Sequence, residues 1–224
     1  VKLTGKIELV DGAKLTIAEG GSLSIDANNI TFGTDSSVVV NGTLNLKLIE
    51  DFTVGSNFAK ESKGKISCTD SFDFIIDTDF ESPINFDCTK NVTLENNKTV
   101  SFGTIKANTF TNKGTTTVNS NLSVETVTNN GTLTIKEDSE IKNFSNNGSA
   151  IVDDSKTLKI TKKFNNEGTF TGKLNLSGSE LETNIKLAVD EKNSVYETIE
   201  IDSSDKNISF TGNPKIKKLK VVSA

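Results

Sequence analysis

The amino-acid sequence predicts an all-β chain wound into a right-handed parallel β-helix, a β-solenoid of about 12 coils of 17–20 residues each, and three observations carry this prediction. Val, Ile, Thr and Phe dominate the apolar positions, and they alternate with polar residues in short runs. An Asn-Gly turn recurs at a nearly constant interval. A second repeat in the first half of the chain has almost the same interval.

Short strands are predicted wherever apolar and polar residues alternate with a period of two. Clear examples are residues 14–17, 22–25, 43–46, 132–135 and 173–176. Asn and Gly interrupt the chain about every ten residues, which is too often for helices but is typical of β-strands joined by tight turns.

The turn motif reads apolar-polar-Asn-x-Gly and occurs four times, starting at Phe110, Val127, Phe144 and Phe164. Its glycines, Gly114, Gly131, Gly148 and Gly168, follow one another at offsets of 17, 17 and 20 in the sequence. A β run follows each copy, at residues 115–118, 132–135, 149–152 and 169–172. This interval is too short for a propeller blade and fits one coil of a solenoid.

Stacked coils bring equivalent residues into columns one strand spacing apart. We therefore expect Asn112, Asn129, Asn146 and Asn166 to form a column in which each amide bonds the next and caps turn backbone groups. We expect the four glycines to supply a positive φ at the corners. This structural role is favoured over ligand binding for the Asn-Gly motifs.

The β runs after the turns divide into inward and outward positions. The inward set is Thr116, Val118, Leu133, Ile135, Ala150, Val152 and Phe170, and the outward set is Thr115, Thr132, Ser149 and Thr169.

The second repeat aligns residues 66–74 with residues 86–94 and also with residues 46–54, at an offset of 20 both times. Cys68 and Cys88 then occupy equivalent positions of adjacent coils, within disulfide reach. A bridge would contribute about 3 kcal/mol through the unfolded state. The alternative is two reduced thiols stacked in the core, and export to an oxidising compartment would favour the bridge.

The whole chain, residues 1–224, is predicted to be one domain, with less regular terminal coils over residues 182–224. Twelve coils at about 4.8 Å each predict a rod roughly 55 to 60 Å long.

Composition argues against several functions. The net charge is −5, and the chain has neither Arg nor His, so the residue types that most often read nucleic acids, ligate metals and transfer protons are missing. We therefore expect no nucleic-acid partner, cofactor or catalytic residue. No run approaches the 18 or so apolar residues of a membrane span, so we expect no membrane insertion of this segment.

The strings at residues 11–17 and 19–25, together with the Asn-Asn-Gly-Thr-Leu-Thr run at 129–134, resemble the passenger regions of bacterial autotransporters and haemagglutinin-type adhesins. The resemblance covers residues 1 to about 180, and no Asn-Pro-Asn-Leu motif of two-partner secretion is present. It implies a protein at the cell surface or secreted, associated with the outer membrane in its parent protein. It also implies a non-catalytic stalk or a surface that binds a protein or glycan of a host cell or matrix.

Two alternatives remain open at this point. Pectin-lyase-like enzymes use the same solenoid, and the densest acidic stretch comprises Asp70, Asp73, Asp77, Asp79, Glu81 and Asp87. Because these residues alternate with Phe72, Phe74 and Phe80 and lack Arg or His partners, a solvated face is favoured, and the missing Gly-Gly-x-Gly-x-Asp repeat argues against a calcium site.

The other alternative is binding to ice or to a crystalline surface. It is suggested by the Thr-x-Thr pairs Thr115/Thr117, Thr132/Thr134 and Thr169/Thr171, which Ser149-Ala150-Ile151 interrupts. Thr is also a common strand residue, which is the simpler explanation of these pairs.

Overall fold

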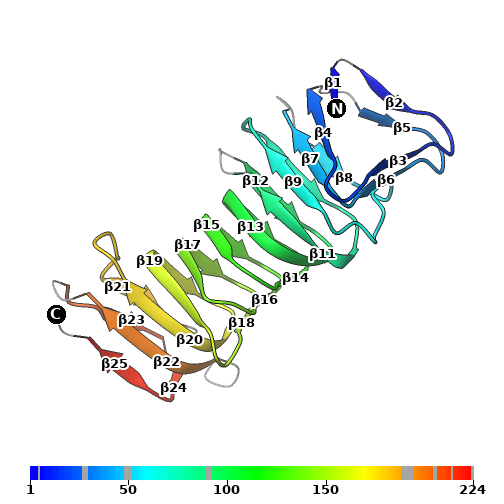
Figure 1. Cartoon of the computed structure of the whole chain (residues 1–224). Coiled ribbons are helices and arrows are strands. Elements are labelled where there is room, and N and C mark those ends of the chain that lie inside the picture. The colour runs from blue at the N-terminus through cyan, green and yellow to red at the C-terminus, as the bar shows by residue number, and fades with distance from the viewer. Residues whose placement is uncertain are drawn as a thin grey trace.

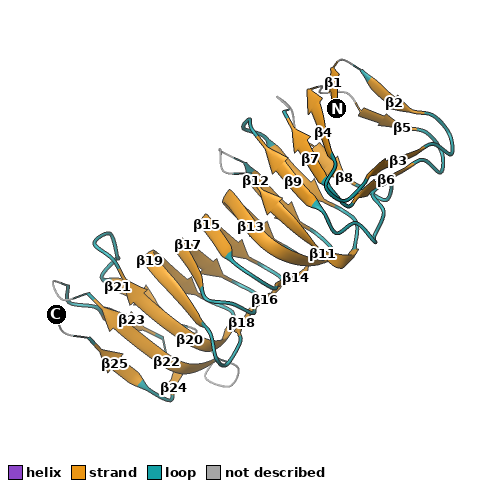
Figure 2. Ribbon diagram, viewed as in Figure 1, coloured by secondary structure: helices purple, strands orange, loops and turns teal. Residues whose placement is uncertain are grey.

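A computed structural model of the chain describes residues 1–4, 6–26, 30–47, 52–88, 92–187, 194–203, 206–212 and 214–222. These residues form strands and turns without helices, and the chain winds into an elongated parallel β-solenoid (Figure 1, Figure 2). All strand pairings within the described parts are parallel, as the repeats predict. Each coil contributes to three faces of the rod in turn.

The chain enters each coil on face 1. Its strands are β1 (Lys2–Thr4), β4 (Ser22–Asp26), β7 (Thr43–Leu46), β9 (Lys65–Cys68), β11 (Phe80–Asp87), β13 (Thr99–Asn112), β15 (Leu122–Asn129), β17 (Ser139–Asn146), β19 (Thr157–Asn166), β20 (Thr169–Ser177), β22 (Val195–Asp202) and β25 (Leu219–Val221). Several of these strands are long enough to turn a corner. β13, for example, pairs on all three faces.

Face 2 follows in each coil. It consists of β2 (Ile7–Leu9), β5 (Ile30–Phe32), β8 (Phe52–Val54), β10 (Asp73–Ile76), β12 (Thr93–Asn96), the C-terminal parts of β13, β15, β17 and β19, β21 (Asn184–Lys186) and β23 (Ser209–Thr211).

Face 3 completes the coil. It consists of β3 (Lys14–Ile17), β6 (Ser37–Val40), the N-terminal parts of β11, β13, β20 and β22, β14 (Thr115–Val118), β16 (Thr132–Ile135), β18 (Ser149–Val152) and β24 (Lys215–Ile216).

Twelve described strands follow one another on face 1, so the number of coils approximately matches the 12 that the sequence predicts. The coils are less uniform than the repeat suggests. Val124 pairs with Ile141 at an offset of 17, but Leu44 pairs with Ile66 at an offset of 22, and Leu174 pairs with Ile199 at an offset of 25. Longer coils towards both ends use more chain for each turn.

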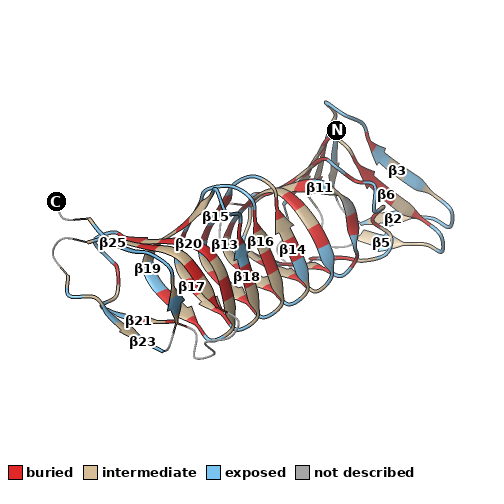
Figure 3. Ribbon diagram, turned by 90° about the horizontal axis from the view of Figure 1, so that it is seen from below, coloured by how far each residue is buried: buried red, intermediate tan, exposed pale blue. Residues whose placement is uncertain are grey.

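A continuous apolar core runs along the axis, because buried residues alternate with more exposed ones along most of the strands (Figure 3). The predicted inward residues Thr116, Leu133, Ala150 and Phe170 are all at most 1% exposed, which confirms the assignment. Aromatic rings stack from coil to coil, as between Phe144 and Phe164, whose ring centroids are 5.8 Å apart.

The first-half register differs from the predicted one by two residues. Leu46 lies opposite Cys68 rather than Ile66, and Phe52 lies opposite Phe74, so this offset is 22 and not 20. The other offset is 20 as predicted, since Ile66 pairs with Phe86. A slip of two leaves each side chain on its original face, so the apolar pattern does not distinguish the two registers. Residues 48–51 and 89–91 of these alignments lie outside the described residues.

The expectation of positive φ at the four turn glycines is wrong. Positive φ occurs among described glycines at Gly12, Gly20, Gly172, Gly178 and Gly212, but not at Gly114, Gly131, Gly148 or Gly168. The turn glycines are required for a different reason, because successive turns approach closely. A Cβ placed on Gly131 would lie 2.0 Å from the carbonyl oxygen of Gly114.

Residues 182–224 continue the solenoid with β21 to β25, and the described parts of this region pair with the coils before them. Among the described residues, no helix has the length and apolar character needed to cross a membrane.

Candidate functional site

The predicted asparagine column is confirmed and lies inside the corner between faces 2 and 3. Asn112 donates from Nδ2 to Oδ1 of Asn129 at 2.8 Å, Asn129 to Asn146 at 2.7 Å, and Asn146 to Asn166 at 2.7 Å. All four side chains are fully buried. The second hydrogen of each of the first three amides goes to a backbone carbonyl of the next coil, those of Thr132, Ser149 and Thr169.

Two further residues, which the motif search missed, extend the column. Asn96 donates to Asn112 at 3.3 Å and to the Thr116 hydroxyl at 2.8 Å. At the other end, Asn166 donates to the hydroxyl of the fully buried Tyr196 at 2.7 Å. Asn96 follows an apolar-polar pair, Leu94-Glu95, but lacks the later glycine, so only the first half of the motif could have identified it.

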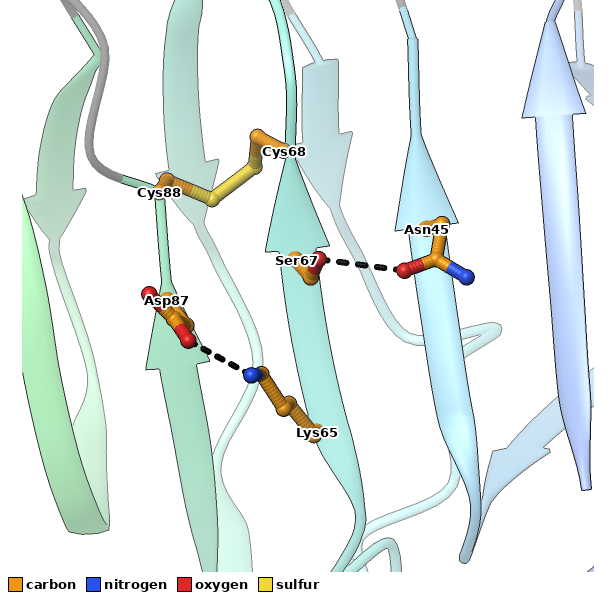
Figure 4. Close-up of a disulfide and its surroundings, with 6 residues drawn as sticks. All are labelled: Asn45, Lys65, Ser67, Cys68, Asp87 and Cys88. Atoms are coloured by element: carbon orange, nitrogen blue, oxygen red, sulfur yellow. Dashed lines mark hydrogen bonds and ion pairs between the residues drawn. A yellow bond between two sulfur atoms is a disulfide. The ribbon is translucent and has the colours of Figure 1, made fainter.

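Cys68 at the end of β9 and Cys88 directly after β11 form a disulfide on face 1, with Cα atoms 4.6 Å apart (Figure 4). One residue earlier on each strand, the outward Ser67 and Asp87 lie opposite each other. Lys65 of β9 pairs with Asp87 of β11 at 2.5 Å, and Ser67 donates to Asn45 of β7 at 3.0 Å. The coils of this region are therefore connected both covalently and by outward polar contacts.

The acidic stretch lies along an outer surface rather than in a cleft. Asp73, Asp77 and Asp79 are exposed, whereas the alternating Phe72, Phe74 and Phe80 are buried. Lys98 pairs with Asp77 at 3.3 Å, and Asp79 accepts the backbone N–H of Thr99 at 2.8 Å. The side chain of Glu81 is outside the part of the chain that the structure describes. Within the described ranges, no three or more His, Cys, Asp or Glu side chains are arranged to hold a metal ion.

The Thr pairs line up on face 3 as two outward columns. Paired strands place Thr115 beside Thr132, Ser149 and Thr169, and Thr117 beside Thr134, Ile151 and Thr171. Thr99 and Ser101 of β13 extend these columns by one coil. None of these outward side chains is charged.

Face 1 is different, because hollows lie along it. One hollow of about 630 Å³ extends from β17 to β22, and its lining includes Asp138, Glu140, Lys159, Lys173, Glu200 and Asp202. A second hollow of about 500 Å³ extends from β13 to β17 and also reaches Glu140. We call these two adjoining hollows the groove. A smaller hollow lies on the same face between β1 and β7.

Sequence reasoning did not identify the groove. Its residues come from outward positions such as Glu140, Lys159, Asn175 and Glu200, which are neighbours in the strand register but follow one another at sequence offsets of 19, 16 and 25. They share no residue type and no fixed interval. The signal lies in the register of the coils and not in a motif.

Most of the charges in the groove are compensated by neighbours. Lys159 pairs with Glu140 at 3.1 Å, and Lys142 pairs with Glu125 at 3.5 Å. Glu200 accepts from Lys220 at 2.9 Å and from Asn175 at 3.3 Å. Among the described residues of the groove, Lys106, Lys173, Asp138 and Asp202 have no ion-pair partner, although Asp138 accepts the backbone N–H of Thr157 at 2.8 Å.

Ion pairs elsewhere on the rod shift the pKa of exposed groups. The Lys186 ammonium, which donates a hydrogen bond to Glu167, lowers the pKa of that carboxyl below its usual value. Lys2 lowers the pKa of Asp26 in the same way, and the hydrogen bond to Glu137 raises the pKa of Lys156. These contacts connect successive coils outside the core.

The geometry supplies a long scaffold of connected coils, a hollowed polar face and a face that carries columns of hydroxyl groups. Comparison with protein-family models, curated proteins and solved structures gives no match to this chain.

Proposed function

We propose that this chain is a non-catalytic, adhesin-like β-helix, either exposed on a cell surface or secreted, that acts as a stiff stalk and presents a binding surface to a host cell, matrix or glycan. The single observation that carries the proposal is the continuous parallel solenoid. Its buried apolar core extends from Ile17 to Ile201, and its long faces present side chains to solvent.

The contacts between coils support a mechanical role. The asparagine column, the disulfide and cross-coil ion pairs such as Lys65–Asp87 and Lys113–Glu95 each join one coil to a neighbouring one. In a solenoid each repeat contacts only its neighbours, so such connections resist bending and fraying along the whole rod.

The proposed location, on a cell surface or outside the cell, rests on two features. The sequence resembles autotransporter passengers and haemagglutinin-type adhesins, which are displayed at bacterial surfaces. Disulfides form and persist mainly in oxidising compartments, so the Cys68–Cys88 bond fits export.

Adhesion can be measured directly. Beads carrying the full chain should attach to cultured cells, to matrix proteins or to immobilised glycans, whereas beads carrying a globular protein of similar charge should not. Failure to attach to all three surfaces would overturn the proposed binding role. Release of reducing or unsaturated sugar ends from polysaccharides by the wild-type chain would instead support a pectin-lyase-like enzyme.

The columns on face 3 favour a second candidate, binding to ice or to another crystalline surface. Ten outward positions from Thr99 to Thr171 hold seven Thr, two Ser and Ile151, with hydroxyls repeated at the strand spacing of about 4.8 Å. A thermal-hysteresis assay tests this candidate. Activity that disappears in Thr134→Lys but persists in Ser123→Lys, a change on face 1, would support it, and no activity would dispose of it.

A further inference from the structure

We propose that the groove on face 1 is the ligand site of this rod and that its ligand is a linear, uncharged polysaccharide. The inference rests on the proposed function and deepens it, because it names the surface that binds and the chemical class that it takes. The argument depends on the shape of the groove, its charge and its hydrogen-bonding groups.

The shape favours an extended ligand. The two hollows that form the groove adjoin at Glu140 and together cross β13, β15, β17, β19, β20 and β22. Six strands at about 4.8 Å spacing make a trough roughly 24 Å long that runs along the rod axis. A compact metabolite would fill a small part of this length, whereas a linear chain would contact several coils at once.

The charge favours a ligand without net charge. Carboxylates and ammonium groups alternate along the groove, and Glu140–Lys159 and Lys142–Glu125 already neutralise one another. A polyanion would meet Asp138, Glu200 and Asp202, and a polycation would meet Lys106 and Lys173. Neither sign gains attraction along the whole trough.

The hydrogen-bonding groups favour hydroxyls over a peptide. Short polar side chains such as Ser123, Thr157 and Thr198 lie among the charged ones and offer donors and acceptors along the groove. An extended peptide would need either an open strand edge or apolar pockets for its side chains. Face 1 presents paired strands, and its groove lining includes only Ala107, Val124 and Leu174 as apolar residues.

No aromatic ring lines the groove, so binding would depend on many weak hydrogen bonds rather than on ring stacking. Affinity should therefore rise with ligand length until the trough is filled. It should also change little with salt, because no net charge is neutralised on binding.

Isothermal titration calorimetry of the full chain tests the proposal. The probes are neutral linear hexaoses of glucose, mannose and N-acetylglucosamine, the corresponding trioses, an anionic hexamer of galacturonate and a cationic hexamer of glucosamine. We expect at least one neutral hexaose to bind, its triose to bind at least about tenfold more weakly, and its Kd to change less than about twofold between about 50 and about 300 mM NaCl.

Two tryptophan substitutions locate the binding. Ser123→Trp fills the groove from an exposed position on β15, and Thr134→Trp places the same bulk on face 3 as a matched control. We expect the first to weaken binding at least about tenfold and the second to leave the Kd within about twofold.

Binding of only the charged hexamers, equal loss in the two variants or no binding of any neutral hexaose would overturn the groove assignment. If attachment of the chain to cells or matrix proteins persists in that case, the adhesin proposal stands without the groove. If no surface is bound at all, both proposals fail.

Discussion

Asn129 lies in the middle of the asparagine column, and its side-chain amide makes three hydrogen bonds. It accepts from Asn112 at 2.8 Å and donates to Asn146 at 2.7 Å and to the Ser149 carbonyl at 2.9 Å. The residue is fully buried, so partners left by a truncated side chain have no access to water. Asn129 therefore stabilises the fold mainly by hydrogen-bonding to buried polar groups of its neighbours, and less through its own packing.

Asn129→Ala is therefore expected to lower the free energy of unfolding by about 2 to 4 kcal/mol, because it leaves a donor and two acceptors unpaired in the core. Its neighbour Asn130 is exposed and accepts only from Asn147, so Asn130→Ala should cost less than about 0.5 kcal/mol. Urea denaturation followed by circular dichroism compares the two. Equal losses would show that the column does not stabilise the core.

Glycine is required for different reasons at Gly12, where φ is positive, and at Gly131, where a Cβ has no space. Gly12 has a φ of 68° with no atom within 4 Å of an added Cβ, and Asn tolerates that conformation. Gly12→Asn should cost about 1 kcal/mol or less. Gly131→Asn should cost about 3 kcal/mol or more, because its Cβ would overlap the Gly114 carbonyl of the previous coil. Thermal melts of both variants check which substitution costs more stability. If a positive φ were the decisive reason for glycine, Gly12→Asn would lower the Tm more than Gly131→Asn.

At the scale of the elements, the sequence predicts the features that recur from coil to coil. It does not predict the features that occur only once. The Asn-x-Gly turns predict the column at Asn112 to Asn166 because every copy carries the same chemistry at one position of the coil. The 46–66 alignment fails by two residues because a slip of two preserves the alternation of buried and exposed residues. The sequence motif does not identify Asn96 and Tyr196, because the two ends of the column are formed by residues that lack the full motif.

The groove could not be predicted for a related reason. A strand residue that faces solvent is free of packing constraints, so Glu140, Lys159 and Asn175 follow no pattern that a search for repeats detects. Their neighbourhood becomes visible only when the coil register is known, including the long coil between Leu174 and Ile199.

The disulfide joins β9 to β11 across one coil, in a register that Ile66 and Phe86 also share. Replacing both cysteines with Ser should lower the free energy of unfolding by about 2 to 4 kcal/mol and preserve the far-ultraviolet circular dichroism spectrum, because strand pairing does not depend on the bond. A reducing agent should reproduce this loss in the wild type and have no further effect in the variant. The wild-type mass should rise by two hydrogens on reduction, and an unchanged mass would contradict the bond.

The contact between Glu167 and Lys186 gives the rod a small pH dependence. The folded-state pKa of Glu167 is lowered, so the contact stabilises the fold above the ordinary carboxyl pKa of 4.5, and this contribution is lost as the pH falls through the lowered value. Glu167→Gln should therefore reduce the Tm slightly at pH 7 and not at strongly acid pH. Because both groups are exposed, added salt should shrink the difference at pH 7. A Tm difference that is the same at both pH values would contradict the electrostatic origin.

At the scale of the whole molecule, the rod is a one-dimensional array in which each coil is stabilised by the coils on either side. The central coils, from β13 to β20, combine the asparagine column with a core of almost fully buried residues such as Phe110, Phe144 and Phe164. The outer coils bury their apolar residues less completely. Near the N-terminus, Leu3, Ile7 and Leu9 are only partly buried, and Leu219 and Val221 of β25 are 52% and 69% exposed.

Hydrogen exchange should reveal this gradient, because a coil with a single neighbour can open without breaking the rest of the rod. Backbone amides in residues 99–177 should exchange slowest, and those in residues 1–32 and 206–222 fastest, when peptides are followed by mass spectrometry. Asn129→Ala should raise exchange most in the coils that contain Asn112 and Asn146, which contact it directly, and much less in β4 or β7. Uniform exchange along the chain, or an equal response of all coils to the substitution, would show a globally cooperative domain and contradict the nearest-neighbour description.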